Sequence, residues 1–344
     1  MLSDRQLQIL QVIVDDFIQT AQPIGSRAIS KKDHVSYSSA TIRNEMADLE
    51  EMGFLEKTHS SSGRIPSEKG YRFYVDHLLA PFRMSKKDLN LIREAFNDHL
   101  IELEHTVQRA ATILSELSNY TSIVLGPEVY ETKLKQLEII PLNDQSAVAI
   151  LVTNTGHVEH RSFTVPEGVD PSDIQIMVNI LNERLVGVPI VQLNDYINTE
   201  IATLLRKHTN NFEKSYKLLH SALLEKRPTK LYVGGKTNIL AQPEFKDVNQ
   251  IRTLLSIIEQ EKEIAPIIRQ NNEGVRVVIG QENKVQAMQN CSLITASYTF
   301  GDKQLGTIAI LGPTRMEYSR VISLLNVLSG QMSKTFQSWY QNGS

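Results

Sequence analysis

Arg43 and Asn44 are adjacent residues of a predicted helix, and both side-chain types pair well with the edges of DNA bases. In the major groove an arginine donates two hydrogen bonds to guanine, and an asparagine exchanges two with adenine. The helical spacing of Ile42, Met46 and Leu49 predicts a buried stripe that leaves Arg43 and Asn44 on another face. A solvated helix face that contacts nothing is the alternative for polar residues in such a position.

The first turn of this helix adds small and hydroxyl side chains to the two larger polar ones. A serine at its start is expected to cap it, because the serine oxygen accepts a hydrogen bond from a free backbone N–H group. The small side chain of Ala40 would allow the backbone to approach base edges closely, and Gly53 is expected to end the helix. The residues of this helix that we predict to contact DNA are Ser38, Ser39, Ala40, Thr41, Arg43 and Asn44.

A turn of hydroxyl residues follows the helix and predicts a second group of DNA contacts. Residues 54–58 alternate like a strand, residues 60–63 read Ser-Ser-Ser-Gly, and residues 64–66 begin a return strand. Hydroxyl and backbone N–H groups bond phosphate oxygens, and an arginine is attracted to the negative potential of a narrow minor groove. The predicted contacts in this turn are Ser61, Ser62, Gly63 and Arg64.

Further helices are predicted on either side of this segment. A capping-box pattern predicts a helix over residues 4–20, a serine cap predicts a short one over 26–32, and another begins after Ser67. The order of these elements predicts a winged helix-turn-helix whose partner is double-stranded DNA. The cations of the flanking helices that we predict to touch the DNA backbone are Arg27, Lys69 and Arg72.

The distribution of charge limits which part of the module can face DNA. The whole chain has a formal net charge of −3, and residues 1–80 contain nine lysines and arginines against eleven aspartates and glutamates. Two shorter windows, residues 23–44 and 57–72, each carry a net charge of +3, while acids crowd into residues 45–56. The predicted DNA-binding helix therefore has a cationic start and an acidic second half, so only its first turns can approach phosphate.

Catalytic and metal-binding chemistry has little support in the sequence. Gly235-Lys236-Thr237 resembles the end of a phosphate-binding loop, but Lys230 stands where the first glycine of that loop belongs. His157 and His160 lie three apart in a strand-like run and would face opposite sides of it. Cys291 is the only cysteine, which excludes an intrachain disulfide and fits a buried thiol in a reducing cytoplasm. We expect no enzymatic activity, no cofactor and no metal.

The rest of the sequence predicts an α+β body. Apolar residues at steps of three and four predict a long helix over residues 84–119 and a second apolar stripe from Val321 to Trp339. We expect these helices to flank one sheet, with pairing of the two stripes between subunits as the alternative. The strand-like segments expected in that sheet are residues 122–125, 134–141, 147–153, 157–165, 275–280, 291–300 and 304–312.

A mainly helical segment, residues 171–270, separates the two groups of strands, and within it only residues 231–234 are clearly strand-like. An insert that buried its apolar stripes against a second copy would give a homodimer with two-fold symmetry, which implies a two-fold operator. Packing of these helices within one chain is the alternative. The predicted domains are 1–80 for DNA binding, 81–166 and 271–344 for the two parts of the α+β domain, and 167–270 for an inserted dimerisation domain.

Several motifs resemble the heat-inducible transcription repressor family HrcA. They are SSATIRNEMADLE at residues 38–50, GRIP at 63–66, GYR at 70–72, IGQEN at 279–283 and LGPTRMEY at 311–318. The resemblance implies a winged helix followed by a GAF-like domain that an inserted dimerisation domain interrupts. It also implies a homodimeric repressor of heat-shock chaperone genes, bound to an inverted-repeat operator and favoured in its active form by a GroEL-type chaperonin.

A regulator of another set of genes, controlled by a small ligand in the GAF-like domain, is the second functional hypothesis. Gly280, Glu282 and Asn283 are the polar residues to consider for such a ligand, and a simple turn after a strand is the alternative for them. No apolar run approaches the roughly 18 residues that a membrane-spanning helix needs. We therefore expect a cytoplasmic protein without membrane contact.

Overall fold

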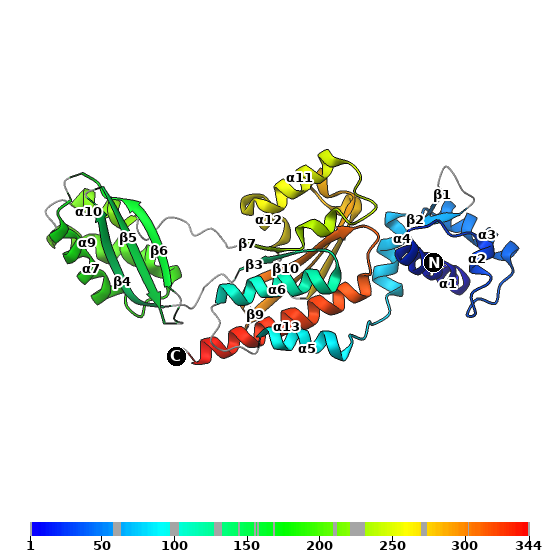
Figure 1. Cartoon of the computed structure of the whole chain (residues 1–344), viewed down its shortest axis with the longest axis horizontal. Coiled ribbons are helices and arrows are strands. Elements are labelled where there is room, and N and C mark those ends of the chain that lie inside the picture. Colours follow the sequence, from blue (N-terminus) through cyan, green and yellow to red (C-terminus); the bar gives the residue numbers. More distant parts are fainter. Residues whose placement is uncertain are drawn as a thin grey trace.

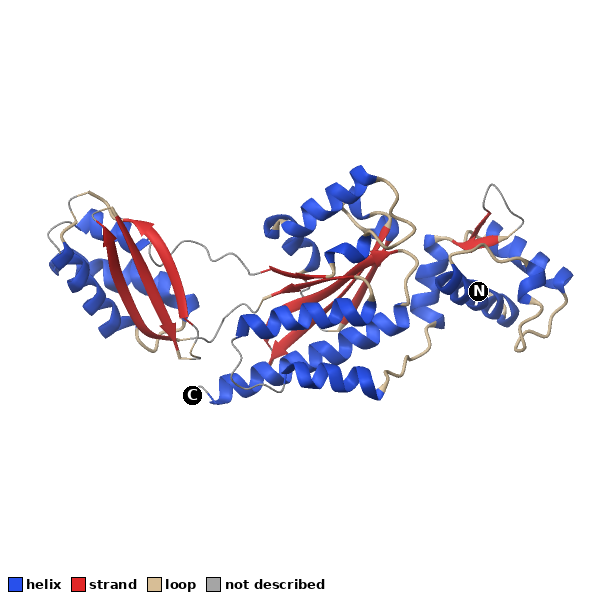
Figure 2. Ribbon diagram, in the orientation of Figure 1, coloured by secondary structure: helices blue, strands red, loops and turns tan. Residues whose placement is uncertain are grey.

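The computed structural model describes residues 2–57, 63–96, 103–126, 133–143, 145–154, 156, 158–167, 169–208, 212–220, 231–269, 274–301 and 303–342. Figures 1 and 2 show three units in a row: an amino-terminal unit, a central unit around a five-stranded sheet, and a third unit around a three-stranded sheet. The third unit lies at one end of the row and the amino-terminal unit at the other. The chain is thus a mixed α+β protein.

The amino-terminal unit contains the helices and the hairpin expected from the sequence. Its elements are α1 (Asp4–Thr20), α2 (Ser26–Ile29), α3 (Ser39–Glu51), β1 (Leu55–Lys57), β2 (Arg64–Pro66), α4 (Glu68–Phe73) and a π-helical turn (Tyr74–Leu78). A capping box between Ser3 and Gln6 begins α1, and β1 and β2 pair antiparallel. The predicted order of elements is confirmed. The second helix is shorter than predicted, since it ends at Ile29 and not at Lys32.

The central unit is built on an antiparallel sheet with the strand order β7-β3-β10-β9-β8. These strands are β3 (Thr121–Leu125), β7 (Leu231–Gly234), β8 (Val275–Ile279), β9 (Cys291–Phe300) and β10 (Lys303–Pro313). One face packs against α6 (Leu103–Ser118) and α13 (Tyr318–Asn342), and the other against α11 (Val248–Glu259) and α12 (Glu261–Ile268). Side chains alternate between the two faces of a strand, and in β10 both sets are apolar. Ile308 and Ile310 face one core, and Ala309 and Leu311 face the other.

The helix predicted over residues 84–119 is in fact two helices. α5 (Lys86–Phe96) and α6 pack against one another, and both pack against α13. The single-helix prediction was wrong because a continuous apolar stripe also fits two helices that fold back on each other. The predicted partnership of this stripe with the carboxyl-terminal helix is confirmed, although the side chain of Trp339 lies outside the described residues.

The third unit corrects the predicted assignment of strands to sheets. β4 (Leu134–Asn143), β5 (Ser146–Thr153) and β6 (Val158–Thr164) form a sheet of their own. They share a separate core with α7 (Pro171–Leu185), α8 (Leu193–Tyr196), α9 (Ala202–His208) and α10 (Phe212–Leu219).

The predicted boundaries at residues 166/167 and 270/271 therefore do not follow the sheets. The strands expected in the central sheet at residues 134–165 lie outside it, and β7, α11 and α12, expected in the insert, belong to the central unit. The insert is also less purely helical than predicted. Alternation of apolar and polar residues identifies each strand but not its partner, because any sheet with one covered face produces the same pattern.

No helix in the described part of the chain combines the length and apolar character that crossing a membrane requires.

Candidate nucleic-acid interface

Hydroxyl groups fix the start of α3. The Ser38 Oγ accepts a hydrogen bond from the backbone N–H of Thr41 at 3.1 Å, as a helix cap does. The Ser39 Oγ lies 3.1 Å from the Ser26 Oγ and so connects the first turns of α3 and α2. Both serines thus have a structural role in positioning this helix end, and their predicted contacts with DNA remain predictions.

The buried stripe of α3 leaves a polar face toward solvent. Ile42 and Leu49 are fully buried and Met46 is 4% exposed, so this side of the helix belongs to the core of the unit. Arg43 and Asn44 are exposed on another side, together with Ala40. The helix is therefore held by its apolar side while its polar side is open.

Arg27 and Arg43 are exposed cations that no group in the described part of the chain engages. Within the described residues neither guanidinium forms a hydrogen bond or an ion pair, and the same holds for the amide of Asn44. Lys31 and Lys57 are exposed and equally unengaged there. These two lysines are not among the contacts predicted from the sequence, although both lie in its cationic windows, which are the signal for them. These four cations and Asn44 can therefore contact a polyanion without first breaking a hydrogen bond or ion pair to a described residue.

Arg64 is in a different situation. Its Nε donates to the Glu50 Oε2 at 2.7 Å, and a terminal nitrogen lies 2.6 Å from the same oxygen. The side chain is only 16% exposed, and the backbone of Arg64 pairs with that of Ile24. Glu50 lies in the acidic second half of α3, so in this structure the arginine is held against the helix and not extended toward a groove.

Other residues of the predicted turn are less informative. Gly63 is buried against Pro23, and a Cβ atom at this position would lie 2.9 Å from the Pro23 Cβ, so close packing accounts for the glycine. Ser61 and Ser62 lie outside the described residues.

Lys69 closes the end of α3. Its Nζ donates to the carbonyl oxygen of Met52 at 2.7 Å and lies 4.6 Å from the centre of the Phe54 ring. A lysine at this position stabilises the helix, because the carbonyl groups of the last turn have no partners within the helix. Lys69 as a whole is exposed, so its contact with a phosphate remains a prediction.

Arg72 points away from the predicted DNA-binding face and into the central unit. Its Nε and one terminal nitrogen donate to the two carboxylate oxygens of Glu282 at 2.8 and 2.6 Å. The guanidinium also donates to the Val277 carbonyl and to Asp76. Burial alone would lower the pKa of this group, but the hydrogen bonds and charges of Glu282 and Asp76 outweigh burial and raise it. The predicted phosphate contact of Arg72 is not supported, because its donors are occupied by Glu282, Val277 and Asp76.

The polar residues suggested for a small ligand are also occupied by the protein. The Asn283 side-chain amide donates to the carbonyl groups of Gly280, Met288 and Cys291, and the residue is 4% exposed. The Glu282 carboxylate accepts from Arg72 and from the backbone of Ile279. Asn283 thus stabilises a turn, and Glu282 forms a contact within the protein.

The fold and the site together define a class of protein. A small unit whose cations near the starts of two helices have no partner among the described residues, carried by a larger α+β body, is the arrangement expected of a DNA-binding regulator. The comparisons with known proteins agree with this class. Residues 104–322 match the family model described as the HrcA protein C terminal domain. The heat-inducible transcription repressor HrcA of Oceanobacillus iheyensis is 57% identical over 344 residues, which cover 100% of both chains.

The chain belongs to the HrcA family of heat-inducible transcription repressors. A transcription repressor acts by binding DNA, so this protein is a DNA-binding regulator and not an enzyme.

Solved structures support the fold alone. A crystal structure described as that of a hypothetical protein is 22% identical with a TM-score of 0.66, covering 98% of this chain and 100% of that one. The IclR protein of Thermotoga maritima is 15% identical with a TM-score of 0.20, covering 96% of this chain and 100% of that one. The second superposition is too poor to indicate a shared fold.

Proposed function

We propose that this chain represses heat-shock chaperone genes by occupying an inverted-repeat operator as a homodimer. In this proposal the amino-terminal unit is a winged helix-turn-helix, and the first turn of α3 enters the major groove with Arg43 on guanine and Asn44 on adenine. Arg27 then meets the phosphate backbone, and the hairpin of β1 and β2 lies beside the groove as the wing. The central unit is the GAF-like domain and the third unit is the inserted dimerisation domain.

One observation supports the DNA-binding face above the others. The polar residues at the start of α2 and α3, Arg27, Arg43 and Asn44, are exposed and have no protein partner within the described residues. By contrast, Arg64 and Arg72 are held by the carboxylates of Glu50 and Glu282. Exposed base-reading and phosphate-binding side chains with no internal role are best explained by an external polyanion.

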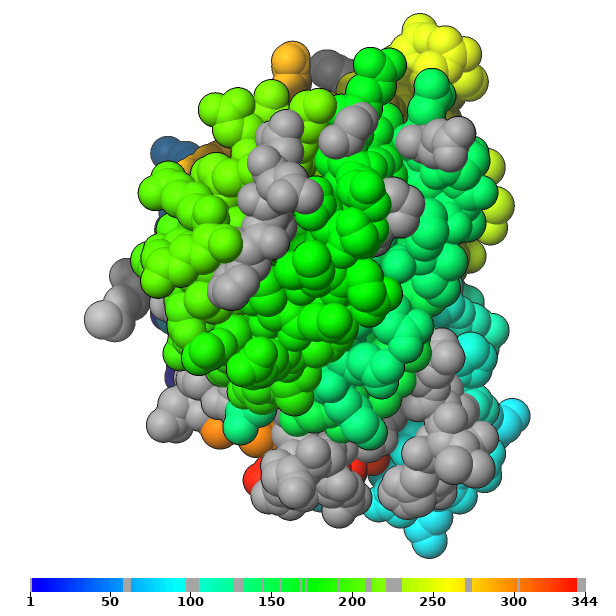
Figure 3. Space-filling model, turned by 90° about the vertical axis from the view of Figure 1, so that its left-hand side faces the viewer, coloured from blue at the N-terminus to red at the C-terminus, as the bar shows by residue number. Residues whose placement is uncertain are grey.

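The proposed homodimer is supported by an open sheet face in the third unit. Ile140 lies opposite Val148 and Val158 opposite Val152, on the side of the sheet away from its buried alternate residues. Ile140 and Val158 are 44% and 55% exposed. Figure 3 looks at the end of the molecule that the third unit forms and shows this unit in front of the other two. Burial of this apolar strip between two copies would give the two-fold symmetry that an inverted repeat needs.

Selection of bound duplexes from a random pool tests the proposal directly. We expect the enriched sequences to contain two inverted half-sites. The Arg43→Ala variant should enrich them poorly, while Arg320→Ala, which removes a surface ion pair of the central unit, should behave like the unaltered chain. Enrichment of asymmetric or unrelated sequences would contradict the proposed operator.

A second arm of the same selection adds a GroEL-type chaperonin, whose support for the active form is part of the proposal and rests on the family resemblance. We expect more of the protein to be recovered in the DNA-bound fraction with chaperonin present. An unchanged bound fraction would remove the chaperonin from the proposal and leave the operator prediction standing.

A further inference from the structure

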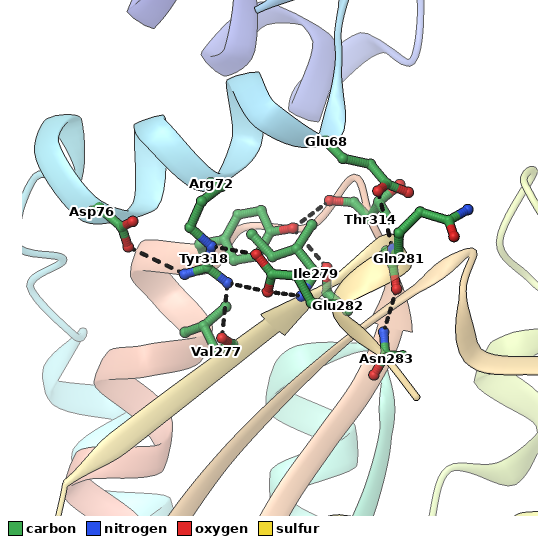
Figure 4. Close-up of polar contacts among 12 residues, drawn as sticks. Glu68, Arg72, Asp76, Val277, Ile279, Gln281, Glu282, Asn283, Thr314 and Tyr318 are labelled. Carbon is green, nitrogen blue, oxygen red and sulfur yellow. Dashed lines mark hydrogen bonds and ion pairs between the residues drawn. The ribbon is translucent and has the colours of Figure 1, made fainter. Parts of the chain in front are cut away.

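Two arginines cross the boundary between the amino-terminal and central units in opposite directions. Arg72 of α4 reaches Glu282, which follows β8, with both of its oxygens engaged at 2.8 and 2.6 Å. Arg315, which precedes α13, donates to the Ile18 carbonyl of α1 at 2.6 Å and is held by Glu244 at 2.5 Å. Figure 4 shows Arg72 pointing from its helix toward Glu282 and the end of β8. The contact between Arg72 and Glu282 is charge-assisted and uses two donors, which fixes its direction as well as its distance. It therefore restrains rotation between the units.

A third polar contact requires a glycine. The Glu68 Oε2 of α4 accepts a hydrogen bond from the backbone N–H of Gln281 at 3.0 Å. Gly280 beside it has a φ of +52°, and a Cβ atom there would lie 2.0 Å from the Glu68 Oε1. The positive φ favours a glycine here, and a larger residue would also displace the Glu68 carboxylate from its place beside the turn. Two segments that carry motifs shared with the family, residues 279–283 and 311–318, therefore both make contacts with the amino-terminal unit.

Apolar packing joins the same surfaces, and it carries one unsatisfied group. The cores of the two units form one continuous cluster, in which the rings of Tyr71 and Tyr318 lie 6.0 Å apart. The Tyr318 hydroxyl is engaged by Ser292 and by the Thr314 carbonyl. The Tyr71 hydroxyl is buried and has no hydrogen-bond partner among the described residues. Burial of an unpaired hydroxyl opposes docking, so the apolar packing and the ionic contacts must offset it.

The docked arrangement leaves the DNA-binding face open. In Figure 1, α4 lies next to the central unit, whereas α2 and α3 lie at the far end of the molecule. Arg27, Arg43 and Asn44 remain exposed in this arrangement. The contact between the units can therefore set the direction of the face without blocking it.

We propose that Arg72, Glu282 and Arg315 are positioning residues for DNA binding, which hold each reading unit in the orientation that a two-half-site operator requires. The inference rests on the proposed function, since orientation matters only when two units must engage one site together. A unit free to rotate loses conformational freedom on binding the second half-site, whereas a docked unit has already lost it. Release of the contacts should thus weaken binding to a complete operator and leave binding to one half-site unchanged.

The test compares Arg72→Gln and Glu282→Gln with Lys236→Gln in the full chain, using duplexes with two half-sites or one. Lys236 forms an exposed ion pair with Glu259 at 3.0 Å within the central unit, so it is a matched control for loss of a charge. We expect both interface variants to lose about fivefold or more in affinity for the complete site. Binding to a single half-site should stay within about twofold, and Lys236→Gln should change neither.

Tyr71→Phe provides a test in the opposite direction. It removes only the unpaired hydroxyl and should leave affinity for the complete site equal to or above that of the unaltered chain. A spectroscopic readout accompanies the series. Cys291 is fully buried, so cysteines introduced at the exposed positions Glu51 and Lys262 can be labelled selectively. The distance distribution between these labels should broaden in Arg72→Gln and Glu282→Gln and not in Tyr71→Phe.

The possible failures are distinguishable. If the unaltered chain binds one half-site as tightly as two, the proposed function fails. If it prefers two but the interface variants lose both affinities equally, or gain affinity, or keep a narrow distance distribution, the positioning role of these residues is wrong while the operator proposal stands.

Discussion

The amino-terminal unit carries arginines on two sides. The front is the side formed by α2 and the first turns of α3, and the back is α4, which contacts the central unit. At the front, Arg27 and Arg43 are exposed and unengaged within the described residues. At the back and along the hairpin, Arg72 and Arg64 are each held by a glutamate, with their side chains 29% and 16% exposed. The comparison predicts that, in this unit, the cations that no carboxylate of the protein engages are the ones that contact DNA.

The physical reason lies in what each arginine must give up to meet DNA. An unengaged arginine exchanges bonds to water for bonds to a base or a phosphate, and counterion release favours this exchange. Arg64 or Arg72 would first have to break a charge-assisted contact and leave a glutamate without its partner. The same residue type therefore suits recognition at the front and orientation at the back.

Gly70→Ala is the change with the largest expected effect on the back of the unit. A Cβ atom at Gly70 would lie 2.2 Å from the carbonyl oxygen of Phe54, a backbone atom that cannot move aside alone. We expect a loss of about 1–3 kcal/mol in the stability of the amino-terminal unit, measured by thermal or denaturant unfolding. The matched control is Gly25→Ala in the same unit, where a Cβ atom meets nothing within 4 Å. Equal stability of the two variants would show that the back of the unit adapts easily.

Arg43→Ala tests the front without touching the fold. The exposed side chain supports no internal contact in the described structure, so stability should change by less than about 0.5 kcal/mol. Specific DNA binding should weaken by about 1–3 kcal/mol, with relaxed discrimination at one base pair. Binding measurements on a set of single-base operator variants would show both effects. Unchanged discrimination at every position would assign Arg43 to the phosphate backbone or to a structural role.

The sequence predicted the helices and strands of the amino-terminal unit well because their signals are local. Caps, apolar spacing and turn residues placed the helices and strands from Asp4 to Phe73 close to their observed bounds. The partners of Arg72 could not be predicted, because Glu282 lies 210 residues away and no local pattern links the two. The same limit explains the wrong assignment of β4, β5 and β6 to the central sheet, since alternation identifies a strand and not its neighbour.

Arg64 can belong to either group of arginines. A double-mutant cycle with Glu50 distinguishes a structural ion pair from a contact with DNA. If the pair persists when DNA binds, Arg64→Ala should reduce stability by about 0.5–1 kcal/mol and change specific binding little. Glu50→Ala should then raise affinity for all sequences, because it releases a cation and removes an anion close to the predicted binding face. A loss of A·T preference in Arg64→Ala would instead mean that the arginine leaves Glu50 and enters the minor groove.

The smallest expected effect separates two lysines near the hairpin. Lys57 is exposed and unengaged within the described residues, whereas Lys69 donates to the Met52 carbonyl and lies over the Phe54 ring. Binding affinity should be measured as a function of salt concentration for each alanine variant. Lys57→Ala should lower the salt dependence by about one released counterion, and Lys69→Ala by clearly less, because its ammonium group already has protein partners. An equal decrease in both would show that an internal hydrogen bond to a carbonyl group, unlike an ion pair with a carboxylate, does not prevent a lysine from contacting phosphate.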